Sequence, residues 1–196
     1  MKFNLSEVND LIRSRRTIFP ENYSDRKVHK EQIENIIQNG QWAPNHGNTQ
    51  PWKFIVFQDK SKERLSDFLA QEYLNQTPKE QQNDAKLAKL LTRPLKSSAV
   101  IAVCLDRKPD SKISELEEIE AVACCIQNMY LTCTAYGLGA FWATPKVMYS
   151  EAMRTFLNLQ EPQKCLALFY IGYPESKDWP KAHRKPIEYT TEWLSE

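Results

Sequence analysis

The chain contains 196 residues, of which 26 are Lys or Arg and 25 are Asp or Glu, so its net charge is +1 at neutral pH. This length fits one domain, which we place over residues 1–196. Apolar residues make up 41% and charged residues 26% of the chain, a balance typical of a soluble globular protein. Because no overall basic field exists, we expect no nucleic-acid partner, and any anion site must be local.

Two features of the sequence bear on the cellular compartment of the protein. The N-terminal residues lack the apolar segment of a secretory signal. Residues 121–145 carry no charge and could span a bilayer, but Gln127, Asn128, Gly137 and Gly139 interrupt their apolar character and favour a buried core segment. We therefore expect a cytoplasmic protein with no membrane partner.

The cysteines are five in number and lack CxxC or cysteine–histidine spacing, which disfavours a disulfide framework and a metal site. Three of them lie on one predicted helix among apolar neighbours. We expect all five to be buried, reduced thiols. They are Cys104, Cys124, Cys125, Cys133 and Cys165.

The first half of the chain alternates helices with one short strand. Apolar spacing predicts a first helix that begins at an N-cap, Ser6, and ends near Arg15. A second helix follows His29 and is stopped by Gly40. Residues 41–51 have no periodicity and form a shaped loop, and residues 54–57 form a short strand. Helices are then predicted over residues 61–74 and 77–96.

The second half contains the most apolar strand and the longest helix. Residues 99–105 are apolar throughout, as in a central strand. Ser114 and Glu117 form a capping box, which begins a helix that continues to about Tyr136 and is stopped by Gly137. A strand over 141–144, a helix over 150–157 and a strand over 166–173 follow, and the tail from Pro174 is extended. Short strands among long helices predict an α+β fold with the sheet covered by helices.

The long helix is uncharged on both faces. Val122, Cys125 and Met129 lie on one face, and Cys124 and Leu131 lie on the other. A helix that is apolar or neutral all round is buried all round. One small domain could cover it alone, but packing against a twin helix is favoured, which predicts an isologous homodimer with this helix at the centre of the interface.

Three local clusters could carry chemistry. Arginine forks and a hydroxyl at residues 13–17 suit a phosphate, although a basic helix end can also simply complement the helix dipole. Residues 43–52 set neutral donors and acceptors between two prolines, which suits the polar edge of a heteroaromatic ring, or else a turn shaped for backbone reasons. Residues 137–144 join glycines to aromatic side chains that could wall a flat ligand, or else form a helix stop before an edge strand.

The chain lacks the common sequence motifs that mark catalytic side chains or nucleotide-binding loops. The chain has no GxGxxG, P-loop, GxSxG, HExxH or CxxC motif, and its three histidines show no metal-ligand pattern. We predict no catalytic side chain and no metal ligand. An enzyme of this kind relies on a bound cofactor for its chemistry.

Taken in order, the motifs resemble the nitroreductase family. Each is weak alone, but together they span nearly the whole chain in a fairly specific order and spacing. They are Arg15-Arg16-Thr17, Ala43-Pro44, Asn48, Gln50-Pro51-Trp52, Phe54, Gln127-Asn128, Gly137-Leu138-Gly139, Trp142, Ile171-Gly172-Tyr173-Pro174 and Arg184-Lys185-Pro186.

The resemblance implies one nitroreductase-like domain that forms a homodimer with two FMN sites across its interface. The cluster after the first helix holds the phosphate and ribityl chain, helped by the basic spot near the C-terminus, where Arg184 or Lys185 makes the contact. The loop reaches the flavin from the partner subunit, and the segment after the long helix passes beside the ring. The implied FMN-binding residues are Arg15, Arg16, Thr17, Asn45, His46, Asn48, Trp142, Ala143, Thr144 and Arg184.

The implied activity is an FMN-dependent oxidoreductase. NAD(P)H gives a hydride to the flavin and leaves, and a small electron acceptor such as a nitroaromatic or quinone is then reduced in the same place. Two alternatives share the scaffold: another flavin reaction such as dehalogenation or desaturation, and a flavin-binding protein with little turnover.

Overall fold

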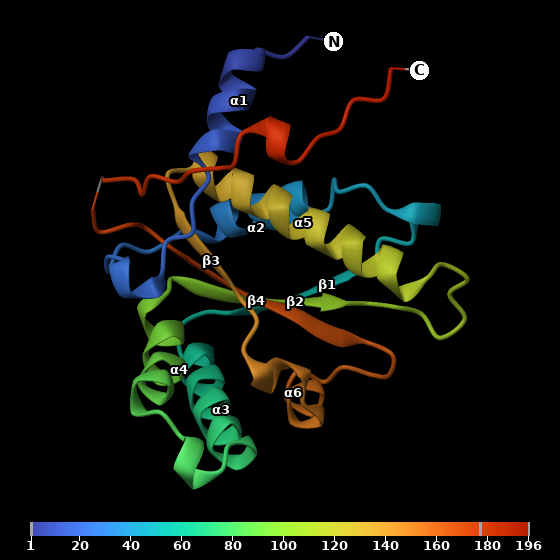
Figure 1. Ribbon diagram of the computed structural model, residues 1–196. Coiled ribbons are helices and arrows are strands. Elements are labelled where there is room, and N and C mark those ends of the chain that lie inside the picture. The colour runs from blue at the N-terminus through green and yellow to red at the C-terminus, as the bar shows by residue number, and fades with distance from the viewer. Residues whose placement is uncertain (1, 177, 196) are drawn as a thin grey trace.

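The computed structural model describes residues 2–176 and 178–195, and it is built around a four-stranded antiparallel sheet (Figure 1). The strands are β1 (Trp52–Phe57), β2 (Ala99–Leu105), β3 (Gly139–Ala143) and β4 (Lys164–Gly172). Their order across the sheet is β1-β2-β4-β3, so the last strand in sequence lies inside the sheet. The predicted α+β fold is confirmed.

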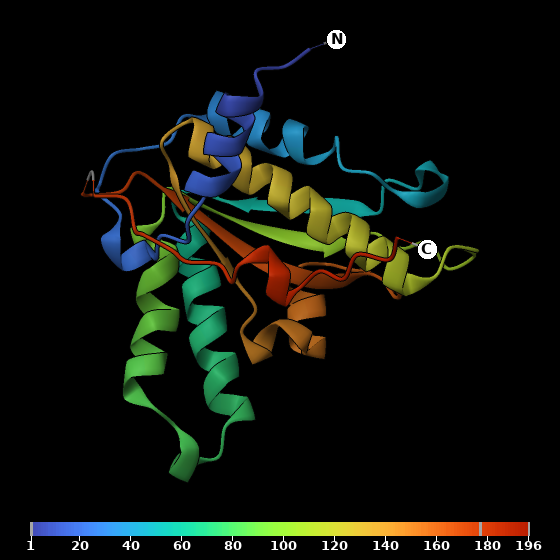
Figure 2. The same cartoon turned by 45° about the horizontal axis from the view of Figure 1, so that its top comes forward.

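Helices cover both faces of this sheet (Figures 1 and 2). The helices α2 and α5 pack on one face, and α3, α4 and α6 pack on the other. The six α-helices are α1 (Leu5–Ser14), α2 (Lys30–Gly40), α3 (Ser61–Gln76), α4 (Asp84–Lys96), α5 (Glu115–Ala135) and α6 (Glu151–Phe156). Strand β2 is buried along its whole length because both of its faces are covered.

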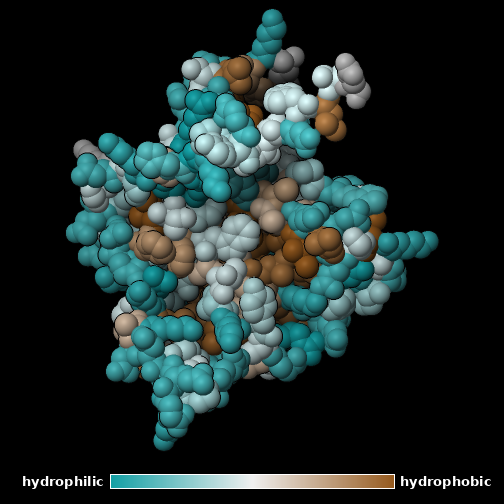
Figure 3. All heavy atoms as spheres, in the orientation of Figure 1, coloured by the Kyte–Doolittle hydropathy of each residue, from teal (hydrophilic) through white to brown (hydrophobic). Residues whose placement is uncertain are grey.

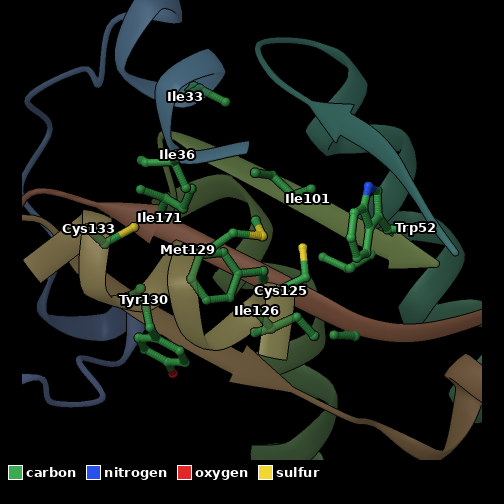
Figure 4. Close-up of a cluster of buried hydrophobic side chains, with 14 of the residues drawn as sticks. Ile33, Ile36, Trp52, Ile101, Cys125, Ile126, Met129, Tyr130, Cys133 and Ile171 are labelled. Carbon is green, nitrogen blue, oxygen red and sulfur yellow. The ribbon is translucent and has the colours of Figure 1, made fainter. Parts of the chain in front are cut away.

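The side chains of β2 alternate between the two layers. Ile101 and Val103 join the cluster under α2 and α5, whereas Val100 and Ala102 join the cluster with α3 and α6. Figure 4 shows the first cluster, with Tyr130 at its margin and the Tyr130 hydroxyl pointing out of it.

Both ends of α5 follow the predicted signals. The Ser114 side chain accepts from the Glu117 amide and the Glu117 side chain accepts from the Ser114 amide, which confirms the capping box. At the other end, Gly137 adopts a φ of +67°. The amide of Leu138 donates to the carbonyl of Cys133, so the helix closes in a Schellman motif.

One predicted helix signal is wrong. The N-cap of α1 is Asn4 rather than Ser6, because the Asn4 side chain accepts from the amides of Ser6 and Glu7. The second helix ends at Gly40, as predicted. A Cβ at Gly40 would lie 2.8 Å from the Met129 side chain, so this glycine also lets α2 approach α5.

Other boundaries shift by a few residues. Residues 77–96 form a short 3-10 turn, Lys79–Gln81, and then α4, rather than one helix. The strands β1 and β4 each begin two residues earlier than predicted. The tail is largely extended, as expected, but Trp179 is half-buried against the core. Among the described residues, no helix is long and apolar enough to cross a membrane.

The circumference of α5 is only partly covered within one chain. Val122, Cys125 and Met129 are fully buried against the sheet and α2. On the opposite side, Cys124 and Gln127 are exposed, so the prediction that all five thiols are buried is wrong for Cys124, which faces away from the sheet. Figure 3 shows apolar surface across the middle of the face on which α5 lies.

Candidate functional site

The segment after α1 is anchored on the edge of the sheet. Thr17 bridges Ala140 of β3, and the Ile18 amide donates to the Ala140 carbonyl at 3.0 Å. The Tyr23 hydroxyl donates to the Ile18 carbonyl at 2.9 Å and lies 3.2 Å from the Tyr170 carbonyl oxygen. These contacts fix the residues at the end of α1 beside β3.

The Tyr23 ring lies over two glycines of the sheet. A Cβ added at Gly172 would lie 2.4 Å from the ring, and one at Gly139 would lie 2.8 Å from it. Any larger residue at these positions would push the ring away. The glycines in the two family-like motifs therefore allow the segment after α1 to approach the sheet.

A cleft of about 370 Å³ opens between the end of α1, the middle of α5 and the end of β3. Among the residues that the structure describes, no carboxylate lines this cleft. The lining residues are Arg15, Thr17, Gln127, Tyr130, Trp142 and Thr144. The structure thus brings together four of the predicted site residues, from two segments far apart in sequence, and a third segment adds Gln127 and Tyr130.

Tyr130 organises the centre of this cleft. Its hydroxyl accepts from the Trp142 amide at 2.8 Å and lies 3.4 Å from the Thr17 hydroxyl. The Arg15 guanidinium lies 4.9 Å from the centre of the Tyr130 ring. Burial raises the pKa of the Tyr130 phenol, so the group is neutral at physiological pH and can donate a hydrogen bond.

The donors of the cleft suit an anion attached to a flat polar molecule. Within the described part of the chain, Arg15 has no carboxylate in salt-bridge distance, so its charge is free for a ligand. Thr17, Gln127 and Thr144 add hydroxyl and amide groups. This set fits a flavin mononucleotide, whose phosphate needs cationic donors and whose ring needs an aromatic and hydrogen-bonding wall.

The Arg16 side chain does not line the cleft. Its guanidinium donates to the carbonyls of Arg15 at 2.8 Å and Pro180 at 2.7 Å, and also to that of Arg13. The Trp179 indole N–H donates to the Ser14 carbonyl. Arg16 therefore holds the C-terminal tail against the end of α1.

Two other predicted residues near these segments, Arg184 and Ala143, do not line the cleft. Arg184 is exposed and lies four residues after Pro180, and its guanidinium donates to the His183 carbonyl at 2.9 Å. Lys185 does not line the cleft either. Ala143 is half-buried against the core on the other side of β3 from Trp142.

The loop that carries Asn45, His46 and Asn48 lies at the other end of α5. The His46 ring nitrogen lies 3.1 Å from Glu117, in the first turn of α5, whereas Gln127 and Tyr130 of the cleft lie ten and thirteen residues later. At the rise of a helix this is a separation of about 15–20 Å along the axis. Within one chain, the loop and the cleft are therefore apart.

The loop is held in an unusual conformation. Asn48 and Gln50 have φ of 52° and 47°, in the left-handed region that non-glycine residues seldom adopt. The Asn45 side chain accepts from the Gln50 amide at 2.9 Å and so closes the loop. Asn45 and Asn48 line a second hollow of about 500 Å³ with exposed Trp42.

Sequence reasoning missed two residues of the cleft. Gln127 belonged to a recognised motif without a site role, and Tyr130 was not singled out. The signal was available in their spacing, because residues three apart on a helix share a face, and this face also points toward Trp142.

A helix-covered antiparallel sheet with an arginine-containing cleft at its edge defines an α+β protein whose cleft suits an anionic, flat ligand. Comparison with known proteins then gives the family. The sequence profile of the Nitroreductase family matches residues 12–173, and the chain belongs to this family.

The relatives agree with this membership. The provisionally named NAD(P)H nitroreductase YfhC of Bacillus subtilis is 26% identical over 183 residues, which cover 93% of this chain and 91% of YfhC. YdjA of Escherichia coli K12, which also carries a provisional NAD(P)H nitroreductase name, is 26% identical over 75% of this chain and 78% of its own. Iodotyrosine deiodinase 1 of Sus scrofa is 27% identical over 93% of this chain and 66% of its own.

Solved structures share the fold over the full length. A nitroreductase-like protein from Bacillus cereus superposes with a TM-score of 0.82 at 24% identity, covering 100% of this chain and 99% of its own. A provisionally named nitroreductase from Desulfovibrio desulfuricans, solved in complex with FMN, superposes with a TM-score of 0.73 at 26% identity, covering 98% of this chain and 99% of its own.

Proposed function

We propose that the protein is an FMN-dependent oxidoreductase that uses NAD(P)H to reduce nitroaromatics, quinones or similar electron-poor acceptors. The observation that carries the proposal is the cleft beside Tyr130, in which the free guanidinium of Arg15 lies among hydroxyl and amide donors with no carboxylate. Family membership and the FMN complex of a relative at 26% identity support it.

Bound FMN would supply the chemistry of accepting a hydride from NAD(P)H and passing it to the acceptor. The side chains of the protein would bind the flavin and orient it. Arg15 and Thr17 would hold the phosphate end, and Trp142, Thr144 and Gln127 would contact the ring and its polar edge. The Arg16 contacts with the tail keep the end of α1 in place, which fixes the direction of Arg15.

We further propose that the site is completed by a second subunit. The loop with His46 and Asn48 lies far along α5 from the cleft of its own chain, so it would serve the cleft of the partner. The exposed, uncharged side of α5 with Cys124 and Gln127 would form the centre of the interface.

Unpartnered apolar side chains at both ends of the chain support the dimer. Helix α1 has no buried residue, and three of its four apolar side chains are exposed. The tail also presents large apolar groups to solvent. These residues are Leu5, Val8 and Ile12 in α1, and Ile187, Tyr189, Trp193 and Leu194 in the tail.

The test is reconstitution followed by spectroscopy. The purified protein, incubated with FMN and desalted, should show flavin absorption that NADPH or NADH bleaches without air. Addition of a quinone should restore the absorption and give steady turnover. A protein that retains no flavin after desalting would contradict the proposal, and one that binds flavin but is not reduced would be a flavin-binding protein with little turnover.

A second candidate activity is reductive dehalogenation, which the likeness to iodotyrosine deiodinase 1 favours. Desaturation has no such support. The reduced protein should be offered a halogenated phenol and a nitroaromatic side by side. Release of halide faster than nitro reduction would assign the protein to dehalogenation.

A further inference from the structure

We propose that a small basic pocket beside the cleft binds a phosphate of the nicotinamide dinucleotide, an inference that rests on the proposed function. The pocket lies between the α3–α4 hairpin and the segment that follows β3. The hairpin projects from the body of the molecule on that side (Figure 2). No residue of this pocket belongs to the predicted flavin site.

The lining of the pocket selects for an anion. Its volume is about 250 Å³, and its charged lining residues are Lys86 of α4 and Lys146 after β3. The rest of the wall is polar or apolar, and among the described residues no carboxylate lines it. Its neutral residues are Tyr73, Gln76, Thr77, Pro78, Gln81, Asn83, Leu90, Pro145 and Val147. The nearest carboxylates in sequence, Glu72, Glu80 and Asp84, do not line it, and Glu72 accepts a hydrogen bond from the Gln76 side chain at 2.6 Å.

The Lys86 side chain lies beside the ring of Tyr73, which is held in a fixed position. The Tyr73 side chain is buried, and its hydroxyl accepts from the Asn83 amide at 2.9 Å, so the ring is held in place. The Lys86 ammonium lies 4.9 Å from the centre of this ring. In the described ranges 2–176 and 178–195, neither Lys86 nor Lys146 has a carboxylate in salt-bridge distance.

A larger cavity, of about 680 Å³, lies by α6 and does not have two unpaired cations. Its Arg154 is paired with Glu151 and Glu161, and its Lys164 is paired with Glu115. Because its cations are already matched by carboxylates, that cavity does not select an anion.

The basic pocket is within reach of a ligand that lies in the cleft. Thr144 lines the cleft, and Pro145 and Lys146 line the pocket. The Cα atoms of Thr144 and Lys146 are two peptide units apart, at most about 7.6 Å. A dinucleotide whose nicotinamide lies at the flavin ring would therefore extend past Thr144 and bring its phosphates to the two lysines.

The test uses the FMN-loaded protein and the variants Lys86→Gln, Lys146→Gln and their combination. Each single change should raise the KM for NADPH about 3- to 10-fold, with little change in kcat, because the phosphate contact that is lost comes from a solvent-exposed lysine and is weakened by water. The KM for 1-benzyl-1,4-dihydronicotinamide, which has no phosphate, should not change. Lys96→Gln, which removes a charge from the same helix outside the pocket, is the matched control.

A binding measurement gives a readout apart from turnover. Adenosine 2′,5′-bisphosphate should bind the wild type by calorimetry, and the double variant should bind it at least 10-fold more weakly. A rise in KM for NADPH but not NADH would place the 2′-phosphate in the pocket, and a rise for both would place the pyrophosphate there.

The outcomes separate this inference from the proposed function. If the wild type oxidises NADPH and the lysine variants match Lys96→Gln, the pocket assignment is wrong and the proposed function stands. If the benzyl compound is affected as strongly as NADPH, the lysines act on the fold and the assignment is also wrong. A wild type that oxidises neither reductant overturns the proposed function and this assignment together.

Discussion

Arg15 and Arg16 are neighbours in the chain, but their side chains have different tasks. The Arg15 guanidinium lies over the Tyr130 ring at the cleft, whereas the Arg16 guanidinium donates to backbone carbonyls, including that of Pro180. Arg15→Ala should therefore weaken FMN binding by about 10- to 150-fold, since one charge-assisted phosphate contact contributes about 1.5–3 kcal/mol.

The matched comparison is Arg16→Ala, measured by flavin fluorescence titration and thermal unfolding. The Arg15 variant should lose affinity while its melting temperature stays near that of the wild type. The Arg16 variant should release the tail, which limited proteolysis with trypsin at Lys181 would detect. If Arg15→Ala binds FMN as tightly as the wild type, the phosphate end lies elsewhere.

The cysteines of α5 offer a second test at this scale. Burial raises the pKa of the Cys125 thiol to about 12 and that of Cys133 further, so both remain protonated and unreactive at pH 8. Cys124 is exposed in the single chain. Iodoacetamide should modify Cys124 in dilute protein and much more slowly once the dimer forms.

Mass spectrometry of the modified peptide measures the rate, and Cys124→Ser identifies which of the adjacent thiols reacts. Modification of that variant at the wild-type rate would mean that α5 opens to solvent. Modification of Cys124 at a rate independent of protein concentration would argue against its burial in a dimer.

At the residue scale, the sequence predicted four of the six residues that line the cleft and missed Gln127 and Tyr130. Arg15, Thr17, Trp142 and Thr144 do line one cleft. Tyr130 was not predicted as a site residue because a tyrosine among apolar helix residues resembles a core residue. The opposite orientation of Arg16 depends on where the tail lies, which local sequence does not determine.

The start of α5 is an element whose stability can be measured directly. Ser114→Ala removes the N-cap and should cost about 0.5–2 kcal/mol of unfolding free energy, with no effect on the flavin spectrum. Urea unfolding measures this cost. Thr155→Ala, an exposed change in α6 outside both caps, is the control, and an equal cost there would contradict a specific role of the cap.

The same cap predicts a pH dependence. Hydrogen bonds from Ser114 and then from His46 hold the pKa of Glu117 below its ordinary value of 4.5. Because the folded-state pKa is the lower one, the carboxylate stabilises the fold above pH 4.5, and this contribution is lost as the pH falls through the folded-state value. The stability difference between the wild type and Glu117→Gln should therefore shrink below pH 4.5. A difference that grows on acidification would contradict this linkage.

The contact of the Tyr23 ring with β4 connects an element to the site. Gly172→Ala would place a methyl group 2.4 Å from the ring, so we expect a loss of about 1–3 kcal/mol of stability and weaker FMN binding as the segment after α1 moves. Combining it with Tyr23→Ala should cost less than the sum of the two single changes. Strict additivity in this cycle would show that the ring and the glycine do not interact.

Element by element, periodicity and caps predicted most of the secondary structure. The range 99–105 was predicted without error because a continuous apolar run bounded by polar residues has few other solutions. Gly40 was correctly predicted as the end of α2, but its close approach to Met129 of α5 depends on tertiary packing, which local sequence does not determine. The strand order could not be predicted, because it depends on long-range pairing.

At the scale of the whole molecule, the central prediction is the shared site. Arg15→Ala and Asn48→Ala homodimers should each be weakly active. If the loop serves the partner's cleft, a mixed dimer carries both defects in one site and leaves the other intact. Random subunit exchange should then restore up to about a quarter of wild-type activity, since half of the dimers have one good site.

Mass labelling must confirm that the subunits exchange. No recovery in an exchanged mixture would place the loop at the cleft of its own chain. Sedimentation of the wild type supplies the independent check, and a monomer of 22.9 kDa at micromolar concentration would contradict the dimer itself.

The position of β4 in the middle of the sheet has a consequence for synthesis of the protein. Ala99 pairs with Ile171, and β4 is the only one of the other three strands that pairs with β3, so the four-stranded sheet cannot be completed until residue 172 has been made. Until then, the wholly apolar β2 keeps an unpaired edge. A growing or truncated chain is therefore a target for aggregation and for chaperones, and a stop codon before Lys164 should yield insoluble protein rather than a partly active one.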